Sequence, residues 1–141
     1  MAKAARVGKP WHPVGMTERI ATCACGQLSV ACRGEPLKVS LCHCRECQRR
    51  SGGPFGVAAF FPPEAVTASG EAREFRRGSD SGFDLIFRFC PTCGSTVWWE
   101  SLRVTDRVAV AVGAFADPAF PAPSQAVYRE HRHAWLAEDL V

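Results

Sequence analysis

The chain has 141 residues, a length typical of a single domain. Hydrophobic residues make up 47% and charged residues 22%, a composition that excludes wholesale disorder. The formal net charge of +3 is too small to indicate a nucleic-acid partner, and no run of about 18 apolar residues predicts a membrane span. Eight cysteines are unusual for such a chain and require a chemical explanation.

Residues 1–16 predict an extended lead-in to a single domain over residues 17–141. The lead-in contains Gly8, Pro10, Pro13 and Gly15 and lacks the apolar segment of a secretory signal peptide. We therefore expect the protein in the cytoplasm, where thiols stay reduced and metal binding is favoured over disulfides.

Alternation of apolar and smaller or polar residues with a period of two predicts short, half-buried antiparallel strands. In chain order, this pattern covers residues 27–32, 55–61, 83–89 and 108–112. Residues 44–50 predict one or two helical turns that end before Gly52, and residues 62–66 predict another short turn. No longer helical pattern exists, so the predicted fold class is mainly β, with short strands folded over metal-binding turns.

Two tight turns, which we call the outer knuckles, contain four of the cysteines. Cys23 and Cys25 precede Gly26, and Cys90 and Cys93 precede Gly94. Zinc binds four ligands in a tetrahedron, and two thiolates from each knuckle satisfy it. The glycines permit sharp turns with positive φ. The spacing predicts one closed structural zinc site on Cys23, Cys25, Cys90 and Cys93; free redox pairs or disulfides are the alternative, although a Cys-x-Cys disulfide would be strained.

The middle cysteines, Cys42, Cys44 and Cys47, form a group of three. Three protein ligands with an open fourth position are typical of a catalytic zinc. His43 is a candidate fourth ligand, but it lies between two cysteines, and its ring points away from them in an extended backbone. A neighbour that is exposed or hydrogen-bonded is the alternative for His43.

The eighth cysteine, Cys32, lies on the same predicted strand face as Leu28 and Val30. Buried free cysteine behaves as a small hydrophobic residue, so the pattern predicts a core position. The alternative is a fourth ligand of the middle group. Trp98 and Trp99 are adjacent on a predicted strand and face opposite ways, so one is expected in the core and the other is a candidate for a pocket wall.

The order and spacing of seven cysteines resembles the glutathione-dependent formaldehyde-activating enzyme / centromere protein V family. The resemblance covers about residues 17–137 and rests on four features: Cys23-x-Cys25-Gly26, Cys42-His43-Cys44-x-x-Cys47-Gln48-Arg49, Phe89-Cys90-x-x-Cys93-Gly94-Ser95 and a late Trp135. It implies an Mss4-like β-tent fold and one family-type zinc-binding domain over residues 17–141. It also implies a structural zinc on the outer knuckles and a second, catalytic zinc on the middle group.

The resemblance further implies a zinc-dependent enzyme of the carbon–sulfur lyase type, with two zinc ions per chain. The namesake activity joins glutathione to formaldehyde as S-hydroxymethylglutathione. We therefore expect glutathione or a similar thiol to add to an aldehyde and form a hemithioacetal at Cys42, Cys44 and Cys47. The expected partners are a small-molecule thiol and an aldehyde, without nucleic acid or membrane. Seven thiolates and two zinc ions bring the net charge close to zero, which argues further against nucleic acid.

Three arginines flank the middle group: Arg45, Arg49 and Arg50. Guanidinium groups bind carboxylates bidentately, and glutathione carries two carboxylates, so these arginines are candidates for glutathione binding. Solvated surface charges are the alternative. Two other functions compete with the enzyme: a carrier of glutathione or a thiol adduct without turnover, and a zinc-stabilised protein-interaction module.

Overall fold

The computed structural model describes residues 17–140, and the predicted lead-in over residues 1–16 lies outside this range. Within the described residues the chain forms short strands and four short helical segments. The strands are β1 (Glu18–Thr22), β2 (Ser29–Arg33), β3 (Lys38–Cys42), β4 (Gly56–Phe61), β5 (Val66–Ser69), β6 (Arg73–Gly78), β7 (Asp84–Phe89), β8 (Thr96–Ser101), β9 (Val108–Ala111) and β10 (Gln125–Val127). The helical segments are α1 (Arg45–Ser51), η1 (Pro63–Ala65), η2 (Val112–Phe115) and η3 (Arg129–His131). The mainly β fold class is thus confirmed.

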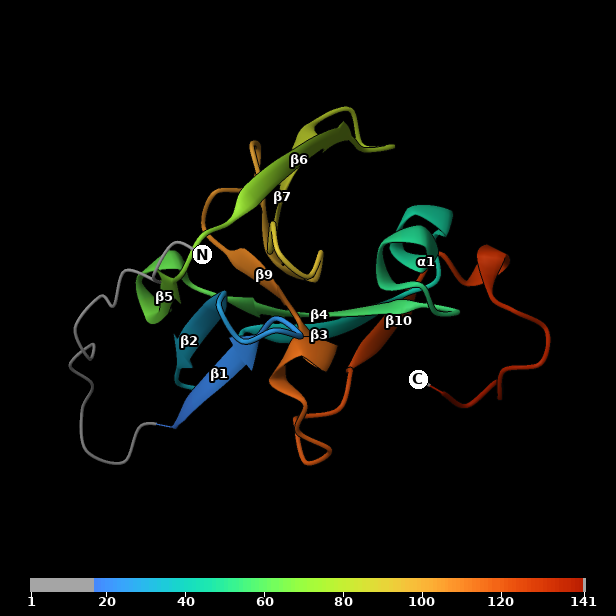
Figure 1. The fold of residues 1–141 in the computed structure, drawn as a ribbon. Coiled ribbons are helices and arrows are strands. Elements are labelled where there is room, and N and C mark those ends of the chain that lie inside the picture. The colour runs from blue at the N-terminus through green and yellow to red at the C-terminus, as the bar shows by residue number, and fades with distance from the viewer. Residues whose placement is uncertain (1–16, 141) are drawn as a thin grey trace.

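Two sheets enclose the core. One has three strands in the order β1-β2-β5, and the other has seven in the order β10-β3-β4-β9-β8-β7-β6, counted over residues 17–140. The pairs are antiparallel except β10, which runs parallel to β3 and departs from the all-antiparallel expectation. Figure 1 shows α1 and the β6–β7 hairpin on one side of β3 and β4, with β1 and β2 on the other.

The hydrophobic core lies between the sheets and confirms the strand face predicted for residues 28–32. Leu28, Val30 and Cys32 are fully buried on β2 and its lead-in. They pack with Phe61 of β4 and Val110 of β9 in one cluster. Cys90 belongs to the same cluster, so the β7–β8 turn, which contains the second outer knuckle, is held close to β2.

Two predicted strands differ from the half-buried pattern. All four residues of β9 are buried, the alanine face as well as the valine face. Ala109 lies in register between Phe60 of β4 and Trp99 of β8, which cover it. On β7 only Phe87 is buried, and the predicted apolar face lines a cavity rather than the core.

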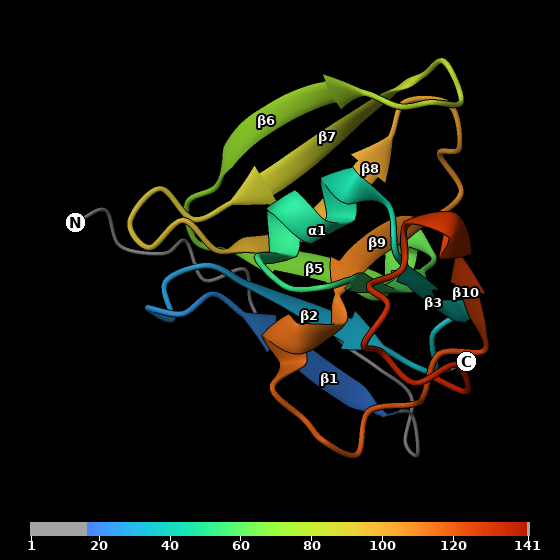
Figure 2. The same cartoon turned by 90° about the vertical axis from the view of Figure 1, so that its right-hand side faces the viewer.

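The segment after β10 lies beside α1. The C-terminal residues run past the helix in both views, as Figure 2 shows most clearly. None of the helices between residues 17 and 140 has the length and apolar character needed to cross a membrane.

Candidate metal centres

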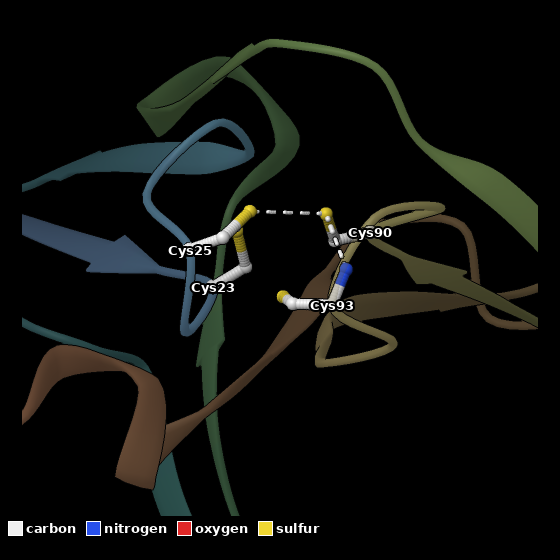
Figure 3. A group of neighbouring side chains, drawn as sticks. All are labelled: Cys23, Cys25, Cys90 and Cys93. Atoms are coloured by element: carbon white, nitrogen blue, oxygen red, sulfur yellow. Dashed lines mark hydrogen bonds between the residues drawn. The ribbon is translucent and has the colours of Figure 1, made fainter. Parts of the chain in front are cut away.

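The outer knuckles lie at the ends of strands from different sheets and meet at one point, which we call the closed group. Cys23 follows β1, and Cys90 follows β7. The four sulfur atoms of Cys23, Cys25, Cys90 and Cys93 all lie within 4.8 Å of one another. Figure 3 shows the four side chains gathered at this point. Cys23 and Cys90 are buried, whereas Cys25 and Cys93 are exposed. The group could therefore hold a metal ion at the edge of the core.

The backbone of each knuckle is shaped by its glycine. Gly26 has φ of 86° and Gly94 has φ of 79°, in the left-handed region that side chains rarely adopt. These turns direct N–H groups toward sulfur. Cys23 Sγ accepts from the Leu28 N–H at 3.3 Å, and Cys90 Sγ accepts from the Thr92 and Cys93 N–H groups at 3.3 and 3.4 Å.

Two polar side chains at the closed group, Gln27 and Ser95, were assigned no role there by the sequence reasoning. Gln27 Nε2 donates to Cys90 Sγ at 3.0 Å and to the Glu71 carbonyl at 2.7 Å. Ser95 Oγ accepts from the Ala24 N–H at 3.1 Å and lies 3.4 Å from Cys93 Sγ, so it links the two knuckles. The Ser95 hydrogen bond lowers the pKa of Cys93 to about 5. Only the adjacency of Ser95 to the Cys-x-x-Cys-Gly motif could have signalled this role.

The middle cysteines form a second group, which we call the open group. Cys42 ends β3, Cys44 caps the N-terminus of α1, and Cys47 lies in its first turn. Their sulfur atoms lie within 4.8 Å of one another, and all three residues are half-buried. Cys44 has extended backbone angles, and its sulfur accepts from the Cys47 N–H at 3.3 Å. The helix start therefore brings three thiols together at one point.

The thiols of the open group differ in acidity. Hydrogen bonds from Cys42 and Cys44 and the positive charge of Arg50 lower the pKa of Cys47 to about 6. The same hydrogen bond with Cys47, together with burial, raises the pKa of Cys42. The cluster therefore accepts negative charge first on Cys47, on which the arginine charge acts.

His43 lies outside the open group. Its side chain is only 2% exposed, and its ring meets Phe55 edge-on with 6.0 Å between centroids. The backbone N–H of His43 donates to the Val127 carbonyl at 3.0 Å, whereas the ring Nδ1 is buried without a hydrogen-bond partner. Burial and the positive charge of Arg132 lower its pKa. The structure thus places His43 as a buried neighbour.

Cys32 lies in neither group of potential ligands. It is 0% exposed in the core, and burial raises its pKa to about 12. A protonated thiol at this position packs as a small apolar side chain.

The three flanking arginines differ in their surroundings. Arg45 and Arg49 are exposed, and Arg49 Nη1 pairs with Glu46 at 2.6 Å. Arg50 turns inward instead, with its guanidinium carbon 4.2 Å from the centre of the Trp99 ring. The guanidinium carbon of Arg77, a less specific candidate from the sequence, lies 4.9 Å from the centre of the Phe87 ring. The helix therefore presents one arginine to the interior and two to the rim.

A cavity of about 690 Å³ opens beside the three thiols. One wall is α1, and the opposite wall is the β6–β8 face with Phe75, Phe87 and Trp99 in register. Trp98, on the other face of β8, is buried in the core. Tyr128 and His131 close the cavity from the C-terminal side. The cavity therefore has thiols, cationic groups and aromatic rings on its surface.

Gln48 holds the C-terminal side of this cavity in place. Its Nε2 donates to the carbonyl groups of His43 at 2.8 Å and His131 at 3.1 Å. Its Oε1 lies 2.8 Å from His133 Nε2. One side chain of α1 thus connects the open group to a segment 83 to 85 residues further along the chain.

The fold and the two cysteine groups define a class of mainly β domains with two potential metal centres. The sequence profile of the glutathione-dependent formaldehyde-activating enzyme family matches residues 18–131, so the chain belongs to this family. A search of curated proteins finds no significant match. A crystal structure of a Rhodobacter sphaeroides protein, solved as a structural genomics target, has a similar fold. Its TM-score is 0.58 at 20% identity, over 76% of this chain and 98% of that one.

Proposed function

We propose that the protein is a zinc-dependent enzyme of the carbon–sulfur lyase type, which joins glutathione or a similar thiol to an aldehyde such as formaldehyde. The observation that carries this proposal is the meeting of three thiols at a cavity of about 690 Å³. Family membership supports an enzymatic role of this kind. The closed group already offers four ligands, whereas the open group leaves a position for substrate.

The donor sets fit zinc, because thiolates are soft ligands that zinc binds in tetrahedral sites. Cys23, Cys25, Cys90 and Cys93 would hold a structural zinc, and Cys42, Cys44 and Cys47 would hold a catalytic one. A free thiol with an ordinary pKa of about 8.5 is only about 3% thiolate at pH 7. When bound at the open group, zinc supplies ionisation and positioning of the substrate thiol.

The side chains around the cavity would orient glutathione. Arg45, Arg49 and Arg77 line the rim, where guanidinium groups can bind the two substrate carboxylates. Phe75 and Phe87 on the opposite wall would provide an apolar surface beside the reacting atoms.

Tyr128 would assist at the aldehyde. It lines the cavity beside the thiols, and burial together with nearby negative groups raises the pKa of its hydroxyl. A neutral hydroxyl can donate a hydrogen bond to the carbonyl oxygen as negative charge develops there. In the proposed reaction the substrate sulfur bonds to the carbonyl carbon. The thiol proton is released, and a proton is taken up on the carbonyl oxygen, which becomes the hydroxyl of the hemithioacetal.

The test is the rate of hemithioacetal formation from glutathione and formaldehyde, measured with and without protein. Because thiols add to formaldehyde unaided, the spontaneous rate is the reference. The proposal predicts a faster rate that disappears in Cys42→Ser. A rate equal to the spontaneous one, despite glutathione binding, would instead identify a carrier. Protein partners that survive Cys42→Ser, without catalysis, would identify an interaction module.

We also propose that the protein works in the cytoplasm on small molecules, without nucleic acid or membrane. All eight cysteines are free thiols in the structure, which suits a reducing compartment. Fractionation that recovers the protein with nucleic acid or membranes would contradict this.

A further inference from the structure

We infer that Arg50 is a positioning residue that supplies the counter-charge of the open group and so favours an anionic thiolate over a neutral ligand there. This inference rests on the proposed function, because it concerns how the same site selects its substrate. It assigns Arg50 a different role from the carboxylate-binding role that its sequence position suggests.

The guanidinium of Arg50 is fixed between α1 and the sheet. Its carbon atom lies 4.2 Å from the centre of the Trp99 ring, within the range of a cation–π contact. Its Nε is buried without a hydrogen-bond partner. Arg50 is therefore a packed side chain, and reaching a substrate at the cavity rim would require leaving Trp99.

Gly56 of β4 makes room for this guanidinium. A Cβ atom at Gly56 would lie 2.5 Å from Arg50 Nη2 and 3.2 Å from Cys47 Cβ. Gly56 is not among the glycines with positive φ, so its backbone does not require glycine. The absence of a side chain serves the close approach of Arg50 and Cys47 to the strand.

The charge of Arg50 acts on the sulfurs. The Arg50 guanidinium and Cys47 both lie against Gly56, and the positive charge of Arg50 acts on Cys47 and Cys42. No carboxylate pairs with Arg50 among residues 17–140, whereas Arg49 pairs with Glu46 and Arg76 pairs with Asp84 at 2.6 Å each. The positive charge of Arg50 is thus directed to the thiolates.

This matters because the open group is already negative when it holds a divalent ion. Three thiolates and Zn²⁺ carry a net charge of −1, and a substrate thiolate would take the centre to −2. Like charges repel strongly where solvent screening is poor. A guanidinium beside Cys47 offsets one of these negative charges. It therefore stabilises the centre more when the fourth ligand is a thiolate than when the fourth ligand is neutral.

The experiment uses the full chain with Co²⁺ at the metal centres, and it follows ligand binding by the cobalt absorption bands. Three probes separate the possible roles of Arg50: glutathione, 2-mercaptoethanol, which is a thiol without carboxylates, and imidazole, which is neutral. We expect Arg50→Gln to weaken the binding of both thiols by roughly 10- to 100-fold, a range typical of removing a partner of a metal ligand. Imidazole affinity should stay unchanged.

Each other pattern overturns the inference. Loss of glutathione affinity alone would make Arg50 a carboxylate anchor. Equal loss for thiols and imidazole would make it a packing residue, and wild-type affinities would leave it without a role. Arg76→Gln is the matched control, because Arg76 pairs with Asp84 and does not line the cavity. Thiol binding without rate enhancement in the wild type would contradict the proposed function alone.

Two further variants keep the test decisive where Arg50→Gln fails to fold. Arg50→Lys keeps the charge and should retain most of the preference for thiols over imidazole. Gly56→Ala keeps Arg50 but displaces its guanidinium, so it should reproduce the selective thiol loss. A Gly56→Ala variant with wild-type thiol affinity would contradict the counter-charge role.

Discussion

The two cysteine groups use the same ligand type but balance its negative charge differently. Around the closed group, N–H groups of Leu28, Thr92, Cys93 and Gln27 donate to sulfur. Around the open group, the described backbone contributes the Cys47 N–H, and the charge of Arg50 acts on the cluster. Neutral dipoles suit a site that never changes its ligands, whereas a full charge suits a site that admits an anion.

The groups also differ in what they connect. The closed group joins the ends of β1 and β7, which belong to different sheets, and two of its cysteines are buried. The open group lies within one short stretch from β3 to α1 and borders a cavity. Loss of the first should therefore affect folding, and loss of the second should affect chemistry.

The largest expected effect is that of Cys90→Ser. Structural zinc contributes about 10–16 kcal/mol in zinc-finger peptides, which is comparable with the whole net stability of a domain, about 5–15 kcal/mol. We expect the variant to be unfolded at room temperature by circular dichroism, even with excess zinc. A Cys90→Ser variant with the wild-type urea midpoint would contradict a structural role for the closed group.

The next effect is that of Cys32→Ser, which places a hydroxyl in the core. Cys32 is fully buried, and burying an unpaired hydroxyl costs about 1–3 kcal/mol. We expect urea unfolding to show this loss while metal content stays as in the wild type. A loss of one metal ion per chain would make Cys32 a ligand after all. Cys32→Ala, which removes the sulfur without adding a polar group, is the control.

Gln48→Ala should act on the open group through its surroundings. The amide of Gln48 contacts His43, His131 and His133, and each lost hydrogen bond costs about 0.5–1.5 kcal/mol. We expect faster amide hydrogen exchange in residues 128–136 and a severalfold lower rate with glutathione. Gln27→Ala is the matched change at the closed group and should leave exchange in residues 128–136 unaltered. Equal exchange rates in residues 128–136 for both variants would contradict the role of Gln48 in holding this segment.

The smallest effect concerns thiol reactivity within the open group after a mild chelator removes its metal. The pKa of Cys47 lies near 6, so at pH 7 it is mostly thiolate, while the raised pKa of Cys42 keeps that thiol protonated. We expect iodoacetamide to label Cys47 before Cys42, with a rate that falls as the pH drops through about 6. Mass spectrometry of the labelled peptides checks the order, and faster labelling of Cys42 would refute it.

Much of the fold and of the cysteine pairing was accessible from sequence, because both depend on short-range patterns. The Cys-x-Cys-Gly and Cys-x-x-Cys-Gly spacings predicted a meeting of segments 65 residues apart at Cys25 and Cys90, and their sulfurs lie 3.6 Å apart. The helical turn at Cys44–Arg50 corresponds to α1, with Gly52 in the left-handed region after it. The family assignment is confirmed over residues 18–131.

Features that depend on tertiary position were not accessible. β6 has almost no buried residues because it is the edge strand of its sheet, so its sequence lacks an apolar alternation. Arg49 and Arg50 are adjacent in sequence, and only the packing of α1 against Trp99 shows which one turns inward. The close approach of Arg50 on α1 to Gly56 on β4 likewise cannot be read from sequence spacing alone.

The most direct test of the division between the two groups is the metal content of folded Cys42→Ser, measured together with its rate of hemithioacetal formation. The account predicts two zinc ions per chain in the wild type. It predicts one in the variant, which keeps the wild-type circular dichroism spectrum and loses all rate enhancement. A variant that unfolds as Cys90→Ser does, or that keeps both zinc ions and the full rate, would contradict it.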